Sequence, residues 1–177
     1  MIDAEATERF MAAPWLGDVD PDSKRAILEA LVEARASAGA TLLEQDQPND
    51  HLTFLIEGTA EIQRTFEGGR REVITTISAP SVFGTTSFFR PDPPSVGVRA
   101  TSDVWMLSLY HPAHEALRQD SPRAAEALAV AILRALSERF DLMDKLLSDY
   151  ITRHRGESSR TSEWAGFRAR LFDERGL

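Results

Sequence analysis

The chain has 177 residues, of which 27% are charged and 42% hydrophobic, and its formal net charge is −8. It contains no cysteine, which excludes disulfides, thiolate metal sites and cysteine nucleophiles. An acidic surface repels nucleic-acid backbones, no apolar run approaches the roughly 20 residues that span a bilayer, and the acidic start is unlike a secretory signal. We therefore expect a cytoplasmic protein of ordinary globular composition.

Residues 1–38 form the first segment, and their pattern predicts helices. Apolar residues that can supply buried faces recur along it, and Pro14 interrupts the first helix. Asp20 or Asp22 is a suitable N-cap for the second helix, with Pro21 at or near its first turn. Gly39 is a typical stop signal, so we expect the helical structure to end there.

Residues 39–120 form the second segment, in which short runs rich in β-branched and aromatic residues alternate with turn residues. Strands this closely spaced, without helices between them, are typical of a barrel, roll or sandwich. A hairpin turn is expected at Glu67-Gly68-Gly69, and a short helix over residues 111–120. The predicted strands are Thr41–Leu43, Leu52–Ile56, Thr59–Phe66, Glu72–Ile77, Val96–Ala100 and Val104–Leu109.

The pattern of residues 121–155 predicts one long helix, with Ser121 as a suitable N-cap and Pro122 in the first turn. Its apolar residues are spaced alternately by four and three positions, which is a heptad seam flanked by charges. Such a helix either packs on its own domain or pairs with its twin in a homodimer. We predict the homodimer, because the preceding domain has helices of its own. The predicted interface is Ala129, Leu133, Leu136, Phe140, Met143, Leu147 and Tyr150.

Residues 156–177 begin with a polar, linker-like stretch and continue with an amphipathic segment. Its apolar residues recur at helical spacing, and four arginines balance four acidic residues. This apolar face either folds back onto the chain or its dimer mate, or docks on a partner protein. The sequence leaves both alternatives open. The apolar residues are Trp164, Phe167, Leu171 and Phe172.

The order of several motifs resembles the cyclic-nucleotide-binding domain of the bacterial catabolite activator family. Pro14-Trp15-Leu16 is similar to the family's entry helix. The run from Leu52 to Gly58 is similar to one of the family's strands and the glycine turn that follows it. Val82-Phe83-Gly84 and Val98-Arg99-Ala100 resemble the strands that enter and leave its phosphate cassette. The resemblance covers roughly residues 8–152. It implies an α+β fold: a β-roll (double-stranded β-helix or jelly roll) with N-terminal helices and a long C-terminal dimerisation helix.

In that family a cyclic nucleotide lies inside the roll, and the resemblance implies three kinds of contact. Backbone amides after a glycine bind the cyclic phosphate, an acidic residue holds the ribose 2′-hydroxyl, and an arginine pairs with the phosphate. Gly84 matches the glycine, but Thr85 stands at the acidic position and Pro94 at the arginine position. Neither side chain can replace the missing charge, and a buried anion requires a charged partner.

The cassette therefore predicts a pocket that has lost the usual ligand, or else one that takes a different anion or nucleotide. In the second case Arg90 is a better source of positive charge than Arg99. We expect Phe83, Phe88 and Phe89 to be core residues in preference to platforms for a base. The candidate ligand-binding residues are Phe83, Gly84, Thr85, Thr86, Arg90, Ser95 and Val96.

Other chemistry is not indicated. His111 and His114 can share a helix face but lack a third metal ligand, and the chain carries no catalytic or phosphate-loop motif. Residues 156–177 are neutral in side-chain charge and too short for the DNA-binding module of the family's transcription regulators, so no direct DNA binding is expected.

These observations favour a non-enzymatic regulatory module that acts through dimerisation and protein contacts. One alternative is a true sensor of a cyclic nucleotide or another anionic small molecule, and a second is a structural assembly subunit. A cyclic nucleotide is the one cofactor considered, and no metal or membrane contact is expected.

Overall fold

The computed structural model describes residues 2–90 and 92–153. The chain separates into two compact units, Met1–Ile132 and Leu133–Leu177. The first unit holds a β-roll with its helices, and the described part of the second continues the last helix. The tail predicted over residues 156–177 lies outside the described residues.

Three helical pieces begin the first unit: α1 (Ala4–Met11), the 3₁₀ turn η1 (Pro14–Leu16) and α2 (Pro21–Glu29). The Asp3 side chain caps α1 by accepting the backbone N–H of Glu5 at 2.8 Å. The Asp20 side chain caps α2 by accepting the backbone N–H of Ser23 at 3.0 Å. Of the two predicted N-caps, Asp20 is therefore the one used, because its oxygen satisfies a free amide of the first turn.

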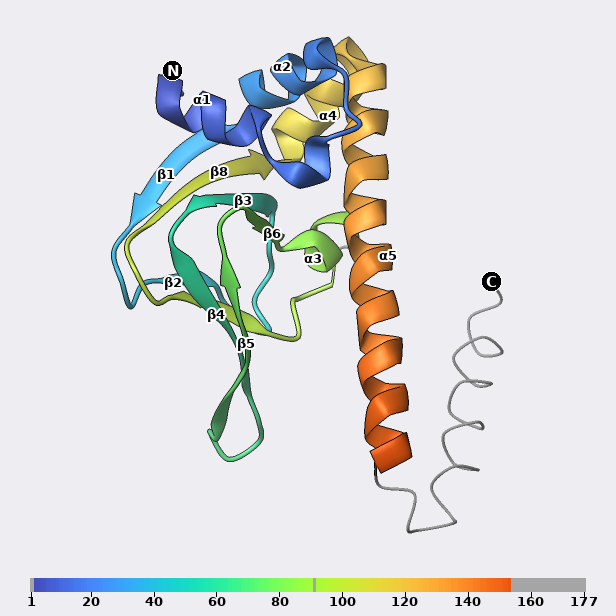
Figure 1. The fold of residues 1–177 in the computed structure, drawn as a ribbon. Coiled ribbons are helices and arrows are strands. Elements are labelled where there is room, and N and C mark those ends of the chain that lie inside the picture. The colour runs from blue at the N-terminus through green and yellow to red at the C-terminus, as the bar shows by residue number, and fades with distance from the viewer. Residues whose placement is uncertain (1, 91, 154–177) are drawn as a thin grey trace. The chain divides into compact units, whose positions relative to one another are not determined.

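Among the described residues, eight strands form two antiparallel sheets, with the orders β1-β8-β3-β6 and β2-β7-β4-β5. Figure 1 shows the N-terminal helices beside β1 and β8, and the long β4–β5 hairpin extending away from them. The predicted α+β β-roll is therefore confirmed. The strands are β1 (Val32–Ala36), β2 (Thr41–Leu43), β3 (His51–Glu57), β4 (Thr59–Thr65), β5 (Arg71–Ser78), β6 (Ser81–Phe83), β7 (Gly97–Ala100) and β8 (Val104–Tyr110).

Strand β1 corrects the prediction that residues 1–38 are helical. Helix α2 ends at Glu29, and β1 pairs antiparallel with β8, with Val32 opposite Ser108. The alanine, glutamate and arginine residues of β1 favour a helix, but pairing with a buried strand outweighs this weak local preference. Gly39, with φ of +88°, lies in the connection between β1 and β2, so it marks a turn and not a helix end.

Buried apolar side chains fill the roll and join the N-terminal helices to it. Phe54 of β3 is fully buried, Trp15 stacks on its ring at a centroid distance of 4.9 Å, and Phe10 meets it edge-on at 5.5 Å. Burying rings of this size stabilises the fold by roughly 1.5–3 kcal/mol for each side chain. The cluster inside the roll consists of Leu43, Leu55, Ala60, Phe83, Val98, Ala100, Val104 and Met106.

Two helices follow the roll: α4 (His111–Asp120) and α5 (Pro122–Arg153). The backbone carbonyl of Ser121 accepts the first hydrogen bonds of α5, from the N–H groups of Ala124 and Ala125. The first turns of α5 pack into the first unit, since Leu128 and Ile132 are buried. None of the helices in the described ranges has both the length and the apolar character that a membrane crossing demands.

Candidate functional site

The cassette implied by the resemblance lies between β6 and β7. Gly84 follows β6 and begins the short helix α3 (Thr85–Phe89), with φ of +78°. A Cβ atom on residue 84 would lie 3.0 Å from the carbonyl oxygen of His51 and 3.3 Å from Nδ2 of Asn49. The left-handed backbone and the close approach of β3 both require glycine here.

The Asn49 side chain ties the cassette to the start of β3. Its Nδ2 donates hydrogen bonds to the carbonyl oxygen of His51 at 2.7 Å and to Oγ of Ser87 at 3.0 Å. The Ser87 hydroxyl in turn donates to the carbonyl oxygen of Gly84 at 3.3 Å. Oδ1 of Asn49 is buried and has no hydrogen-bond partner. Sequence reasoning missed this residue, because an Asn in a turn-rich stretch gives no sign of a partner on a distant helix.

The predicted ligand-binding residues are divided between the interior and the surface. Phe83 is buried in the cluster inside the roll, and Thr85 is buried in the first turn of α3. Thr86 and Ser95 are exposed, and Val96 is half-buried. The structure therefore does not bring the whole predicted set together around one space.

Arg90 and Pro94 determine which charge the cassette offers. The Arg90 side chain is 65% exposed, and its guanidinium forms an ion pair with the Asp92 carboxylate. Pro94 is buried, and its carbonyl oxygen accepts the backbone N–H of Asp46 at 2.9 Å. The arginine favoured from the sequence thus lies at the surface beside a carboxylate. The position expected to carry the family's arginine holds the loop in place instead.

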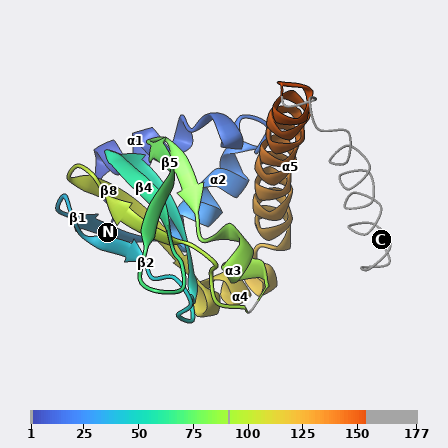
Figure 2. The same cartoon turned by 90° about the horizontal axis from the view of Figure 1, so that it is seen from below.

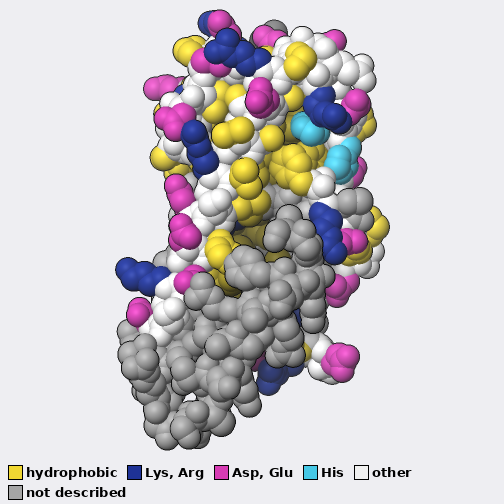
Figure 3. Space-filling model, turned by 90° about the vertical axis from the view of Figure 1, so that its right-hand side faces the viewer, with side chains coloured by type: hydrophobic (Ala, Val, Ile, Leu, Met, Phe, Trp, Pro, Cys, Tyr) yellow, Lys and Arg dark blue, Asp and Glu magenta, His cyan; other side chains and the backbone are white. Residues whose placement is uncertain are grey.

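Four rings form a cluster between α3 and α4, here called the Phe–His cluster: Phe88, Phe89, His111 and His114. The Phe88 ring stacks on His111 at a centroid distance of 4.4 Å and meets His114 edge-on at 5.2 Å. Phe88 is buried, as predicted, but Phe89 is 44% exposed, so its prediction as a core residue is wrong. Figure 3 shows histidine side chains beside hydrophobic side chains on one face of the molecule.

Burial lowers the pKa of the His114 imidazole, and the nearby Arg118 and His111 lower it further, while Glu115 raises it. A hydrogen bond with His51 lowers the pKa of the Asp50 carboxyl, and Nδ1 of His51 lies 2.9 Å from Oδ1 of Asp50. The lowered pKa favours a neutral His114 ring near neutral pH, which suits its packing against Phe88. Within residues 2–90 and 92–153, no three histidine, aspartate or glutamate side chains gather as metal ligands would.

The chain also matches known proteins. Residues 33–121 match the family model of the cyclic nucleotide-binding domain. The chain belongs to this family. It is 27% identical over 133 residues to the CRP-like cAMP-activated global transcriptional regulator of Mycobacterium tuberculosis, a match that covers 75% of this chain and 58% of the relative. The chain thus spans less than two thirds of the curated relative's length.

Solved structures support the same cyclic nucleotide-binding fold. A cyclic nucleotide-binding domain from Methylobacillus flagellatus has a TM-score of 0.74 at 18% identity, covering 82% of this chain and 84% of that one. The N-terminal domain of a transcriptional regulator from Streptomyces coelicolor has a TM-score of 0.64 at 25% identity, covering 76% and 94%. The Thermus thermophilus catabolite activator protein has a TM-score of 0.63 at 24% identity, covering 77% and 63%.

Proposed function

We propose that this chain is a non-enzymatic regulatory module whose cassette does not bind cyclic AMP in the usual way, and which acts through dimerisation and protein contacts. Membership of the cyclic nucleotide-binding domain family and a relative named as a transcriptional regulator support the regulatory role. The net charge of −8 favours protein partners in the cytoplasm over direct contact with DNA.

The observation that carries the proposal is the lack of charge in the cassette. Thr85 can offer a hydroxyl but no carboxylate for a ribose, and Pro94 offers neither a positive charge nor a backbone donor. Arg90 points to solvent, where Asp92 already neutralises it. An anion buried here would lose its hydration without gaining a charged partner, which costs several kcal/mol. Phe83 and its neighbours fill the roll interior instead.

Apolar side chains on α5 support dimerisation. Leu133, Phe140 and Met143 are 63%, 52% and 53% exposed, and all three belong to the predicted heptad seam. Covering each of them with a second helix contributes roughly 1.5–3 kcal/mol, which favours pairing of α5 with a second helix. In the same seam Ala129 is exposed and Leu136 is half-buried, while the side chains of Leu147 and Tyr150 lie outside the described residues.

A true sensor is the second candidate, and one observation favours it. The buried Oδ1 of Asn49 lacks a partner, so a ligand donor could satisfy it from the side of the cassette. The relative from Mycobacterium tuberculosis is named as cAMP-activated. A bound molecule that moved α3 would then also move α4, because the Phe–His cluster joins these two helices.

Isothermal titration of the full chain with cyclic AMP, cyclic GMP and cyclic di-GMP separates these candidates. We expect no binding tighter than about 100 μM to the wild-type chain, and a gain of cyclic AMP binding in the double variant Thr85→Glu, Pro94→Arg. Arg90→Ala is the matched control, and it should change neither result. Tight binding by the wild-type chain would overturn the proposal in favour of the sensor.

The dimer has its own test. Phe140→Asp places a charge in the seam, so it should abolish the α5 contact and lower the sedimentation mass below that of the wild-type chain, while the melting temperature of the roll stays unchanged. The control is Glu138→Gln, which alters an exposed flanking position of the same helix. A wild-type chain that sediments as a monomer at all concentrations would overturn dimerisation without affecting the conclusion on the cassette.

A further inference from the structure

In the part of the chain that the structure describes, strand β1 is the outermost strand of its sheet, and one of its edges has no ladder partner. In the described ranges its ladder partner is β8 alone, from Val32 opposite Ser108 to Ala36 opposite Val104. Figures 1 and 2 both place β1 at the margin of the roll. An edge strand presents backbone N–H and C=O groups that can pair with another strand. β1 has no proline, and its register with β8 shows no bulge, so two usual protections are absent.

An open cavity of about 820 Å³ runs along this edge. Its lining includes Leu31, the strand residues 32–35, and four residues of the preceding N-terminal segment: Ile2, Thr7, Leu28 and Glu29. Successive strand residues point to opposite faces of a sheet. A cavity that touches all four of these strand residues therefore reaches the edge of the strand and is not confined to one face. This edge has room for a further strand.

The residues of β1 are complementary to themselves when the strand is read in the opposite direction. In an antiparallel pair centred on Ala34, Glu33 of each strand lies opposite Arg35 of the other, and Val32 lies opposite Ala36. Residues directly opposite each other in such a pair have Cβ atoms about 4.5–5.5 Å apart, which favours opposite charges and tolerates small side chains. The edge strand β5, Arg71–Ser78, has no such complementarity.

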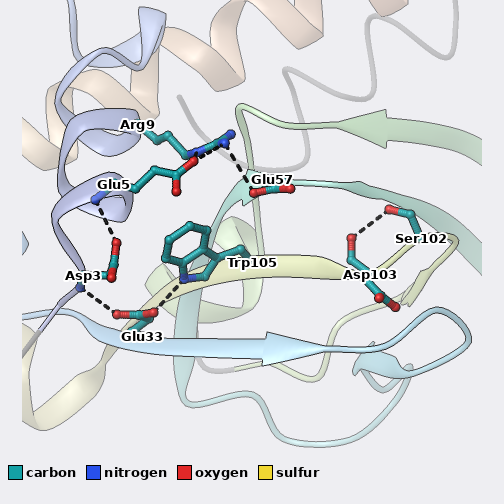
Figure 4. Close-up of polar contacts among 8 residues, drawn as sticks. All are labelled: Asp3, Glu5, Arg9, Glu33, Glu57, Ser102, Asp103 and Trp105. Carbon is teal, nitrogen blue, oxygen red and sulfur yellow. Dashed lines mark hydrogen bonds and ion pairs between the residues drawn. The ribbon is translucent and has the colours of Figure 1, made fainter.

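Both charges are held in position on the outer face of β1. Glu33 accepts the backbone N–H of Asp3 at 2.9 Å and the indole N–H of Trp105 at 2.8 Å (Figure 4). The Arg35 guanidinium lies 3.8 Å from the centre of the Trp105 ring. Each carboxylate oxygen of Glu33 keeps a second lone pair, and the stacked guanidinium keeps donors at its rim. Little side-chain freedom is lost when these groups meet a partner.

We propose that a second copy of this chain pairs with β1 about a two-fold axis centred on Ala34. The pairing joins two four-stranded sheets into one and places two Glu33–Arg35 pairs across the contact. This interface goes beyond the proposed function and is separate from the seam on α5. Where both interfaces form, the chain assembles beyond a dimer, since each two-fold contact uses a different surface.

Charge variants at Ala34 test the pairing. Ala34 is exposed, so Ala34→Glu and Ala34→Lys should leave the fold intact, which thermal unfolding verifies. Each variant alone sets like charges opposite each other at the axis and should weaken association at least about tenfold by sedimentation equilibrium. An equimolar mixture of the two variants should regain the association, because opposite charges then meet. Thr76→Glu and Thr76→Lys on the exposed strand β5 are the matched controls and should have no effect.

The series is measured in the full chain with and without Phe140→Asp, which separates the two interfaces. If α5 also pairs, Ala34→Glu reduces a larger assembly to a dimer; if α5 does not pair, it reduces a dimer to a monomer. Equal masses for the wild-type chain and Ala34→Glu at every concentration would overturn the proposal. Weakened association that the mixture does not restore would also overturn it, because Ala34 of one copy would then not lie opposite Ala34 of the other.

Discussion

The ring of Phe88 on α3 lies flat against the imidazole of His111 on α4, with centroids 4.4 Å apart and planes inclined by 6°. Helix α3 belongs to the cassette, and α4 leads through Ser121 directly into α5. The stacked pair is thus a direct contact between the cassette and the helix that leads into α5. Any change of the cassette that moves α3 must either carry His111 with it or break this stack.

Truncating Phe88 tests how much this contact contributes. Phe88→Ala removes a buried ring and leaves a cavity between α3 and α4, so we expect a loss of about 3–5 kcal/mol in the free energy of unfolding by urea. Phe89→Ala is the matched control, because the neighbouring ring is 44% exposed and its removal should cost much less. Equal losses for the two variants would show that the stack has no special role.

The lowered pKa of His114 predicts a pH dependence of stability. The folded state resists protonation of this ring, so it binds fewer protons than the unfolded chain below the ordinary histidine pKa of about 6.5. The free energy of unfolding should therefore fall as the pH drops below that value. His114→Asn should flatten this slope. Asp50 acts in a separate window, since its lowered pKa adds stability that is lost only at more acidic pH. Identical slopes for the wild-type chain and His114→Asn between pH 7 and pH 5.5 would contradict the assignment.

The sequence predicts the roll well, because its strands alternate with clear turn residues. Phe66-Glu67-Gly68-Gly69-Arg70 forms the expected hairpin, with the backbone N–H of Phe66 donating to the carbonyl oxygen of Arg70 at 2.8 Å. The sequence fails at β1, where Ala34 and Arg35 favour a helix and only the distant partner β8 makes a strand. It also fails for Asn49, whose partner Ser87 lies 38 residues away. Interactions between distant residues decide both cases, and local patterns do not contain them.

Two glycines in turns provide a matched test of backbone constraint. Gly58 has φ of +90°, and a Cβ atom there would lie 2.3 Å from the carbonyl oxygen of Asp103. Gly68 has φ of +84°, but a Cβ atom there would meet nothing within 4 Å. Gly58→Ala should therefore cost at least about 2 kcal/mol more in thermal unfolding than Gly68→Ala, which bears only the conformational penalty of about 1 kcal/mol. Similar losses would mean that the β3–β4 turn relaxes to accept the methyl group.

Removing the Asn49 amide tests whether it holds the cassette in place. Asn49→Ala deletes the hydrogen bonds to the His51 carbonyl and the Ser87 hydroxyl, and we expect a loss of about 1–3 kcal/mol in the free energy of unfolding. Ser87→Ala should cost less, and the double variant should cost less than the sum of the two, because both residues share one hydrogen bond. If Asn49 only stabilises the fold, its removal should speed up hydrogen exchange equally in α3 and β3. Positioning of the cassette instead predicts that hydrogen exchange speeds up in α3 more than in β3, so equal acceleration in both elements would refute it.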